Sequence, residues 1–410
     1  MGNPASGVFK AVSYKVETTF GVAAGAAGAQ LLRRTSSTID LSKDVYESAE
    51  IRTDFQDADY RHGVRKVAGA IGGELSPKTY SDFFAAMVKR DFTALTAITA
   101  VGLTISGAGP TYTVVRTAGS WLTDNFKMGH VVRFTVGALG AGNLNRNVLI
   151  VDVVNATTLT VIPLNGSNGI AMNAEGPITG CTVTMVGKQT FIPITGHTDK
   201  SFSIEHWFSD VTPTANELFL GCKIDKGALS LPPTGIATVN FDIMGKDITP
   251  STARYFTTPT AVTTTTSVAA VNGVMRVGGV TVASITGLTI EIDPTFTGDA
   301  VVGQNAIPFL FAGKVKVTGQ MTAYFDSTAL RDQFINETEA EVIVALTSDN
   351  SNTSEFIVLT MSRVKTGGAS KDDKDGGLIQ TLPFKALLNN AGGAGTKNEQ
   401  TTIMIQDSAA

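Results

Sequence analysis

The feature that most constrains the fold is a strand-and-helix unit, residues 66–87, that returns in altered form about 250 residues later. Its first part has the small and branched residues of a strand. Ser76 and Pro77 then stand where the N-cap and first position of a helix would be. The apolar residues that follow have helical spacing and are Tyr80, Phe83, Phe84, Met87 and Val88. The unit therefore predicts a strand followed by a helix with one apolar stripe.

A shift of 250 residues brings this unit onto a second segment of the chain. The residues that coincide are Lys66 with Lys316, Val67 with Val317, Gly69 with Gly319, Ile71 with Met321, Ser76 with Asp326, Tyr80 with Leu330, Asp82 with Asp332 and Phe84 with Phe334. A shift of 251 places residues 38–40 on residues 289–291, ahead of the unit in both cases. The strand, the capping type and part of the stripe recur, so the sequence predicts one fold present twice.

The composition fits a folded chain without an excess of basic charge. Of its residues 43% are hydrophobic, and 32 basic against 36 acidic residues give a net charge of −4. Stable binding of nucleic acid through its phosphates is therefore disfavoured. Cys181 and Cys222 have neither the number nor the spacing of a disulfide scaffold or metal site, so free thiols are expected. The chain has no apolar run of 18 residues, and we expect neither a membrane span nor signal-peptide export.

The composition shifts along the chain indicate four parts. The predicted first copy is discontinuous and comprises residues 1–92, of which 1–35 form an arm, and residues 191–256. Between them, residues 93–190 form an inserted small all-β domain, because short strands rich in Thr, Val and Gly alternate with turns. These strands are expected at 112–116, 131–136, 148–154, 159–162 and 182–186. A Thr-rich linker, 257–270, leads to the second copy, 271–410.

Within the first copy, residues 201–208 alternate with period two, which predicts a strand with one buried and one exposed face. A helical turn is expected at 214–219 and a long strand at 236–244. The strand at 236–244 has a predicted counterpart in the second copy, in which Thr238 and Phe241 match Thr381 and Phe384.

No pattern of catalytic or metal-binding residues stands out. His62, His130, His197 and His206 are scattered without zinc-type spacing, and Walker, nucleophile-elbow and zinc-protease motifs are absent. Residues 371–376 imitate the start of a calcium loop but lack its closing carboxylate, so a charged hairpin tip is predicted. We expect no enzyme activity, no cofactor and no metal.

Three segments carry a resemblance to a known family: 61–84, 221–247 and 314–330. By the order and spacing of these motifs, residues 1–92 and 191–410 resemble the tail tube proteins of long-tailed bacteriophages. The resemblance implies a mainly β fold, a β-sandwich or barrel with a short flanking helix, present twice. It also implies that chains close into rings, that stacked rings form a hollow shaft for the genome, and that a duplicated member closes as a trimer with six folds. The inserted domain resembles the outward-facing decorations of some tails.

The same resemblance implies the partners and the location. The chain would assemble with itself, with tape measure and tail-end proteins, and with transiently passing double-stranded DNA, without membrane insertion. It would be made in the host bacterial cytoplasm and reside in the virion tail. A neutral-to-acidic wall fits a conduit that must not hold DNA.

Ring stacking and ring closure need contact surfaces, and the long polar connection 42–65 is the main candidate because aromatic residues mix there with charges of both signs. The predicted contacts are Asp54, Phe55, Asp57, Asp59, Tyr60, Arg61 and Arg65, with Phe296, Phe309 and Phe311 in the counterpart segment 296–311. A loop folded back on its own sandwich is the alternative.

Two other functions remain open at this stage. The inner tube of a contractile injection device or phage-derived bacteriocin would share the fold. A surface carbohydrate-binding β protein would use the inserted domain as a lectin, although Trp121 is the only tryptophan in that block.

Overall fold

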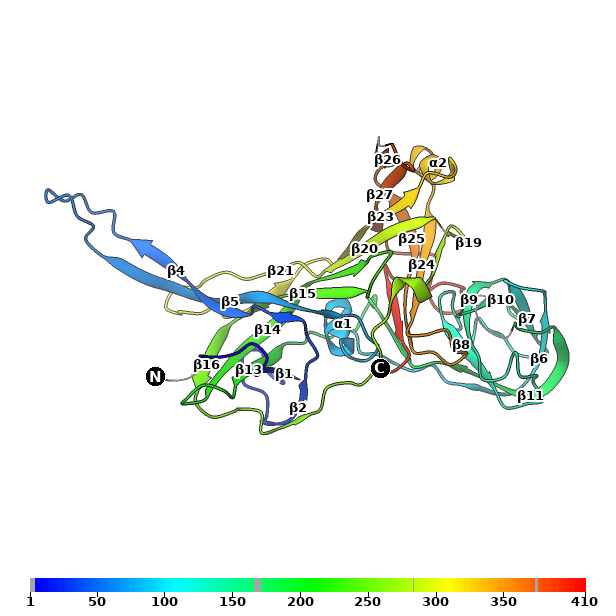
Figure 1. The fold of residues 1–410 in the computed structure, drawn as a ribbon, viewed down its shortest axis with the longest axis horizontal. Helices are drawn as coiled ribbons and strands as arrows, with labels where there is room; N and C mark the ends of the chain where they lie inside the picture. The colour runs from blue at the N-terminus through cyan, green and yellow to red at the C-terminus, as the bar shows by residue number, and fades with distance from the viewer. Residues whose placement is uncertain (1–3, 166–170, 283, 373–374) are drawn as a thin grey trace.

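The computed structural model describes residues 4–165, 171–282, 284–372 and 375–410, and these residues are mainly β. They form strands β1 to β28, the short helices α1 (Ser81–Val88) and α2 (Ala329–Ile335), and one 3₁₀ turn, η1 (Ala270–Asn272). A curled sheet occupies the middle of the molecule, a long hairpin projects at one end, and a closed barrel lies at the other (Figure 1). The mainly β prediction is confirmed.

The curled sheet contains two antiparallel sets of four strands. The first set, in spatial order, is β4 (Asp40–Glu47, extended at its edge by β3, Ser36–Ser37), β5 (Tyr60–Glu74), β15 (Thr238–Gly245) and β14 (Ala215–Leu231). The second set is β20 (Ile285–Asp293), β23 (Lys316–Tyr324), β27 (Ile379–Ala386) and β25 (Phe356–Thr366), which β26 (Ser370–Lys371) continues. Strands β14 and β20 pair, so the two sets form one continuous eight-stranded surface.

The strand registers of the two sets coincide. Three pairs of opposite residues in the first set each have an equivalent pair in the second. Asp40–Ala68 corresponds to Glu291–Thr318. Val67–Gly245 corresponds to Val317–Ala386, and Leu229–Val239 corresponds to Lys371–Gln380. Corresponding residues thus differ by a constant 251, 250, 141 and 142 positions in the four strands. An irregularity in β14 between Ile224 and Lys226 recurs where β25 gives way to β26. Register is set by the whole pattern of buried residues, so this agreement is a strong constraint.

One sequence match within these sets was offset by two residues. The registers place Leu382, rather than Phe384, at the position equivalent to Phe241, because Phe241 lies opposite Ile71 and Leu382 opposite Met321. A slip of two residues keeps every side chain on its own face, so alternation alone could not reveal the error.

A second layer covers one face of each set. In the first it consists of β13 (Phe202–Phe208), β1 (Lys10–Val16), β2 (Ala27–Leu31), β16 (Asp247–Ser251) and β17 (Thr258–Thr260). In the second it consists of β24 (Ala340–Thr347), β28 (Met404–Asp407), β12 (Lys188–Phe191), β18 (Val274–Val277) and β19 (Val280–Thr281). Strands β14 and β25 each run from one layer into the other, and one apolar core extends through both sets.

Helix α1 fills the core of the first set. Phe83, Phe84, Met87 and Val88 are all buried, which confirms the apolar stripe. The helix begins at Ser81, four residues later than predicted, and Ser76 Oγ is hydrogen-bonded to Thr79 Oγ1 instead of capping it. The predicted second helix exists as α2, although none of its residues is buried.

The barrel is closed by six strands in the order β10, β7, β6, β11, β8 and β9. Their bounds are β6 (Ile98–Ser106), β7 (Tyr112–Arg116), β8 (Val131–Thr135), β9 (Asn147–Val153), β10 (Thr158–Pro163) and β11 (Glu175–Met185). The sequence predicted five of these strands and missed β6. The barrel packs through Val131, Leu149 and Ile162 on Ile343 and Phe356 of the second set, although it interrupts the first set in sequence.

Four local predictions were wrong. Residues 214–219 are not a helical turn but the start of β14, because they pair with β13 on one side and β16 on the other. Residues 1–35 contribute Val12 and Tyr14 to the core and are more than an arm. The polar face of β13 is buried, because Glu17 and Ser13 from the N-terminal segment bond to it. Half of the connection 42–65 is strand, because β4 extends to Glu47 and β5 begins at Tyr60, which leaves residues 48–59 between them.

Two further predictions concern the Thr-rich linker and the charged hairpin tip. Part of the linker pairs with β2 as β17, and Thr263 and Thr265 bond to the segment before α1, so it is anchored along the first set. The predicted hairpin tip 371–376 lies partly outside the described residues.

Candidate assembly surfaces

The most exposed part of the molecule is the projecting hairpin, residues 44–62, where β4 and β5 extend beyond the sheet (Figure 1). Its strands stay paired up to Glu47 and Tyr60. At the tip, Ile51 and Phe55 are each 99% exposed, and Tyr60 is 56% exposed. Large apolar side chains with almost no intrachain contact are typical of surfaces that another molecule covers.

Several predicted contact residues lie at this tip, and their charged side chains form ion pairs with neighbouring residues of the hairpin. Arg52 bonds Asp54 at 2.6 Å, and Arg61 bonds Asp59 at 2.9 Å. Each guanidinium lowers the pKa of its partner carboxyl, so both acids are ionised at neutral pH. Asp57 is exposed beside them.

Arg65 lies at the base of the hairpin instead of the tip. Its guanidinium is 2.9 Å from Asp247, and its backbone N–H donates to Asn305 O at 2.8 Å. Within the chain Arg65 therefore links the first set to the segment that follows β20.

That segment forms a second hairpin, the inner hairpin, residues 294–314, with strands β21 (Phe296–Thr297) and β22 (Phe311–Ala312). Phe296 pairs with Ala312 as Val45 pairs with His62, so the two hairpins share a register. The inner hairpin, however, lies against the first set instead of projecting.

The aromatic residues of the inner hairpin have different surroundings. Phe296 is buried with Val64, Ile307 and Leu310, so it contributes to packing inside the chain. Phe309 and Phe311 are 62% and 65% exposed, with ring centroids 6.2 Å apart. This exposed pair is available to a partner.

A further surface, which the sequence reasoning missed, is the face of the eight-stranded sheet that no second layer covers. We call it the open face. It is dominated by small polar and uncharged residues, including Ser42, Ala68, Thr238, Asn240, Ala228, Ser230, Thr289, Thr318, Gln320, Thr322 and Thr381. The Thr-rich alternation of β20 and β23 was the available signal.

The charges of the open face are largely balanced. Lys66 lies 3.0 Å from Asp44, and Lys226 lies 2.9 Å from Glu291. Exposed ion pairs of this kind add little stability, but they cancel the local field that phosphates would feel.

The outer edges of the sheet are a third candidate surface. Among the strand pairs of the described residues, β3 and β4 pair only with β5, and β26 pairs only with β27. Unpaired edges are templates for pairing with another chain.

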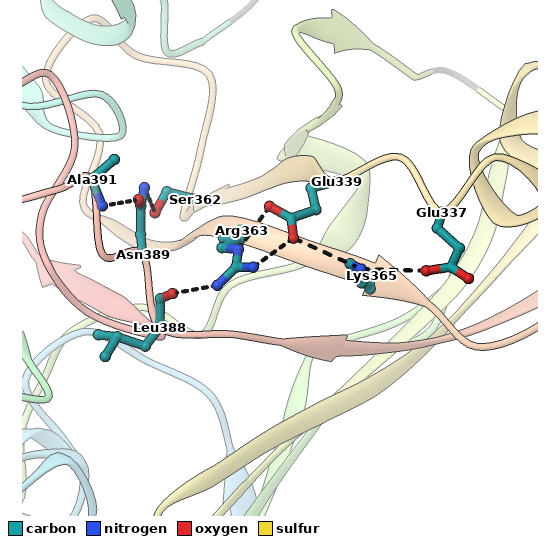
Figure 2. Close-up of polar contacts among 8 residues, drawn as sticks. All are labelled: Glu337, Glu339, Ser362, Arg363, Lys365, Leu388, Asn389 and Ala391. Atoms are coloured by element: carbon teal, nitrogen blue, oxygen red, sulfur yellow. Dashed lines mark hydrogen bonds and ion pairs between the residues drawn. The ribbon is translucent and has the colours of Figure 1, made fainter.

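A charged network supports the edge at β25. Arg363 binds both carboxylate oxygens of Glu339 at 2.7 Å and donates to Leu388 O at 3.0 Å (Figure 2). Lys365 follows on the same strand, 3.6 Å from Glu337 and 4.0 Å from Glu339. The guanidinium lowers the pKa of Glu339, which keeps this network ionised.

The histidines offer no catalytic arrangement. His130 is completely buried, which lowers its pKa to about 3, and burial also lowers the pKa of His206. In the described part of the chain no three His, Cys, Asp or Glu residues are grouped as a metal site would need. Neither of the short helices there is long and apolar enough to cross a membrane.

The barrel does not present its tryptophan. Trp121 is fully buried, and its Nε1 donates to Thr157 O at 2.9 Å. Stacking of a sugar on this ring is therefore blocked in the structure.

Open sheet edges, a projecting hairpin with bare apolar residues and an uncovered polar face define a structural protein built to assemble with other chains. Comparison with known families agrees: the model of phage tail tube proteins matches residues 10–386, so the chain belongs to the phage tail tube protein family. Its members are structural components of the virion tail, and the chain is accordingly not an enzyme. Among curated proteins the comparison found no match.

Proposed function

We propose that this chain polymerises into stacked rings that form the hollow tail tube, and that each chain supplies two equivalent tube folds, so that three chains close one ring. The observation that carries the proposal is the common register of the two strand sets, including the irregularity in β14. Two sets that pair identically can occupy equivalent places around an axis. A ring of six such places needs only three chains.

The strand count agrees with a wide channel. Each chain has eight strands in its continuous sheet, so three chains give about two dozen, more than the barrels that hold only side chains or a small plugged lumen. The open face would line the channel, since the second layers cover the opposite face. Its Thr, Ser, Asn and paired charges offer DNA no basic wall to bind, which suits passage during ejection.

The barrel, within residues 93–190, is proposed as an inserted domain on the outside of the tube. It packs on the layer of the second set that lies away from the open face. In this arrangement it could enlarge without narrowing the channel.

Electron microscopy of the purified full-length chain tests the proposal. Rings or rods with a central hole, and a ring mass of three chains, are expected. A monomer that stays dispersed at high concentration would contradict it, and a six-chain ring would contradict the trimer.

A deletion tests the role of the projecting hairpin. Removal of residues 46–60, joined by a two-residue turn, should leave a folded protein, because this segment has almost no core contacts. We expect normal circular dichroism and loss of polymers. Wild-type tubes from the deletion variant would remove the hairpin from the assembly surface.

A further inference from the structure

The junction between the two strand sets inside the chain provides a template for other junctions. Strand β14 meets β20 with Leu229 opposite Ile290, both buried, and Ala228 opposite Glu291 on the open face. An ion pair, Lys226 to Glu291 at 2.9 Å, crosses the junction. This is a complete sheet contact between two equivalent sets.

The two outer edges carry the equivalents of the same strands. By register, β3 and β4 correspond to β20, and β25 with β26 corresponds to β14. Among the described residues, β3 and β4 pair only with β5, and β26 pairs only with β27, so these strands have no partner on their outer side. The edge at β3 and β4 thus matches the β20 side of the internal junction, and the edge at β26 matches its β14 side.

Transfer of the internal register to these edges gives definite pairs. The internal pair Leu229–Ile290 corresponds to Lys371 of one chain opposite Ile39 of the next. The internal pair Ala228–Glu291 corresponds to Ser370 of one chain opposite Asp40 of the next. Gly227 and Ile292 likewise become Ala369 and Leu41. Both of these last residues already border the core while half-buried, so the pairing would cover them.

The hairpins follow the same rule but with different chemistry. Inside the chain, the inner hairpin packs on Val64 and Met244, and Lys223 Nζ donates to Leu310 O at 3.1 Å. The equivalent positions at the free end of the second set are Lys314, Lys385 and Lys365. Two apolar positions in the receiving surface have therefore become lysines.

The hairpin that would meet these lysines has changed in the matching direction. Where the inner hairpin packs through Phe296, Ile307 and Leu310, the projecting hairpin has six acidic residues and one basic residue between 44 and 59, a net charge of −5. The acidic residues are Asp44, Glu47, Glu50, Asp54, Asp57 and Asp59. Since the whole chain has a net charge of −4, the acidity is concentrated in this hairpin.

From these matches we infer that a second copy of this chain binds head to tail through the outer edges: residues 39–41 of one chain pair with residues 369–371 of its neighbour, with Asp40 opposite Ser370. The acidic projecting hairpin then lies on the neighbour's Lys314 and Lys385. The inference rests on the proposed function, because it names the contact that closes the ring. Such a heterologous contact closes when its rotation repeats the internal one. Charge distinguishes the hairpin contact between chains from the hairpin contact within a chain, where Phe296, Ile307 and Leu310 pack on apolar residues.

Disulfide trapping tests the register. Directly opposite residues of antiparallel strands have Cβ atoms about 4.5–5.5 Å apart, close enough to bridge with a small shift. The variant Asp40→Cys/Ser370→Cys should form interchain disulfides in oxidised rings, seen as covalent dimers and trimers on a non-reducing denaturing gel. A second pair in the same register, Ser42→Cys/Gly368→Cys, repeats the test if the first variant does not fold. Native Cys181 and Cys222 are both buried.

The internal junction supplies a positive control, and a slipped pair supplies a negative one. Ala228→Cys/Glu291→Cys occupies the equivalent positions within a chain and should form an intrachain bridge. Leu41→Cys/Ser370→Cys is slipped by one residue, which puts the thiols on opposite faces and should prevent bridging.

The outcomes separate the inference from the proposed function. If unmodified protein forms no rings, the proposed function fails. If rings form and the internal pair bridges, but neither interchain pair does, or the slipped pair bridges instead, the inference is overturned and the ring remains.

Discussion

Reversal of charge on the projecting hairpin should weaken assembly and be repaired by the opposite reversal on the receiving surface. Glu47 and Glu50 are exposed acids of the hairpin, and Lys314 and Lys385 are exposed lysines of the receiving surface. We predict that Glu47→Lys/Glu50→Lys and Lys314→Glu/Lys385→Glu each raise the concentration needed for assembly. The quadruple variant should recover most of the loss.

The size of the effect follows from the number of charges changed. An exposed ion pair is worth about 0.2–1 kcal/mol, and reversal both removes an attraction and adds a repulsion. Two reversals then change each interface by about 1–4 kcal/mol, or roughly 5-fold to several-hundred-fold in the association constant. Because the Debye length falls from about 10 Å at 0.1 M salt to about 3 Å at 1 M, the difference should shrink strongly at high salt.

Sedimentation measures this directly. The protein concentration of each variant is varied from low to high in about 0.05 M NaCl, where screening is weak, and in about 1 M NaCl, where screening is strong. Circular dichroism on dilute samples confirms that the variants fold. Loss of assembly that the quadruple variant does not recover, or effects independent of salt, would show that these charges do not meet.

Three further predictions concern stability. Glu205 is fully buried and accepts from Ser13 Oγ, Asn216 Nδ2 and two backbone N–H groups, so Glu205→Ala should lower the free energy of unfolding by about 3–5 kcal/mol in urea titrations, with a smaller loss for Glu205→Gln. Burial raises the pKa of the Asp407 carboxyl above its ordinary value of about 4, so above that pH the folded state keeps a proton that the unfolded state has lost. The free energy of unfolding therefore falls as pH rises toward the folded-state pKa. Asp407→Asn should remove this fall, which melting curves between about pH 4 and pH 7 would measure. A Cβ at Gly319 would overlap Thr289 O, so Gly319→Ala should cost about 1–3 kcal/mol, and an unaffected melting temperature would show that the backbone yields there.

The sequence predicted the repeated unit because matching residues recur at a nearly constant offset, and close packing explains two of them, Gly69 and Gly319. A Cβ at Gly69 would meet Thr38 O, just as one at Gly319 would meet Thr289 O, and both glycines must stay small. Five of the six barrel strands were likewise predicted, because short segments rich in Thr and Val are separated there by turn sequences.

Other features depended on contacts that local pattern cannot show. The polar face of β13 looked solvated, but Glu17 bonds Ser201 and Ser203 from a distant segment and buries it. The start of β14 resembled a helical turn because only its two neighbouring strands make it extended.

The candidate surface was predicted in part. Residues 54–61 do lie at an exposed tip, but Arg65 and Phe296 are engaged within the chain. The open face was not predicted, because most of its residues are small and uncharged and its charges form balanced pairs, so no sequence motif marks it. Its function as proposed depends on that neutrality, which a search for charged or catalytic motifs passes over.

The C-terminal strand β28 sets the order in which the molecule can be completed. Asp407 accepts hydrogen bonds from Lys78 N and Ser81 Oγ at the start of α1, and β28 pairs with β12, which follows the barrel. During synthesis, the hydrogen bonds at the start of α1 therefore form only after residue 407 has been made. A chain made only as far as β27 therefore lacks both these hydrogen bonds to the start of α1 and the pairing of β28 with β12 and β25.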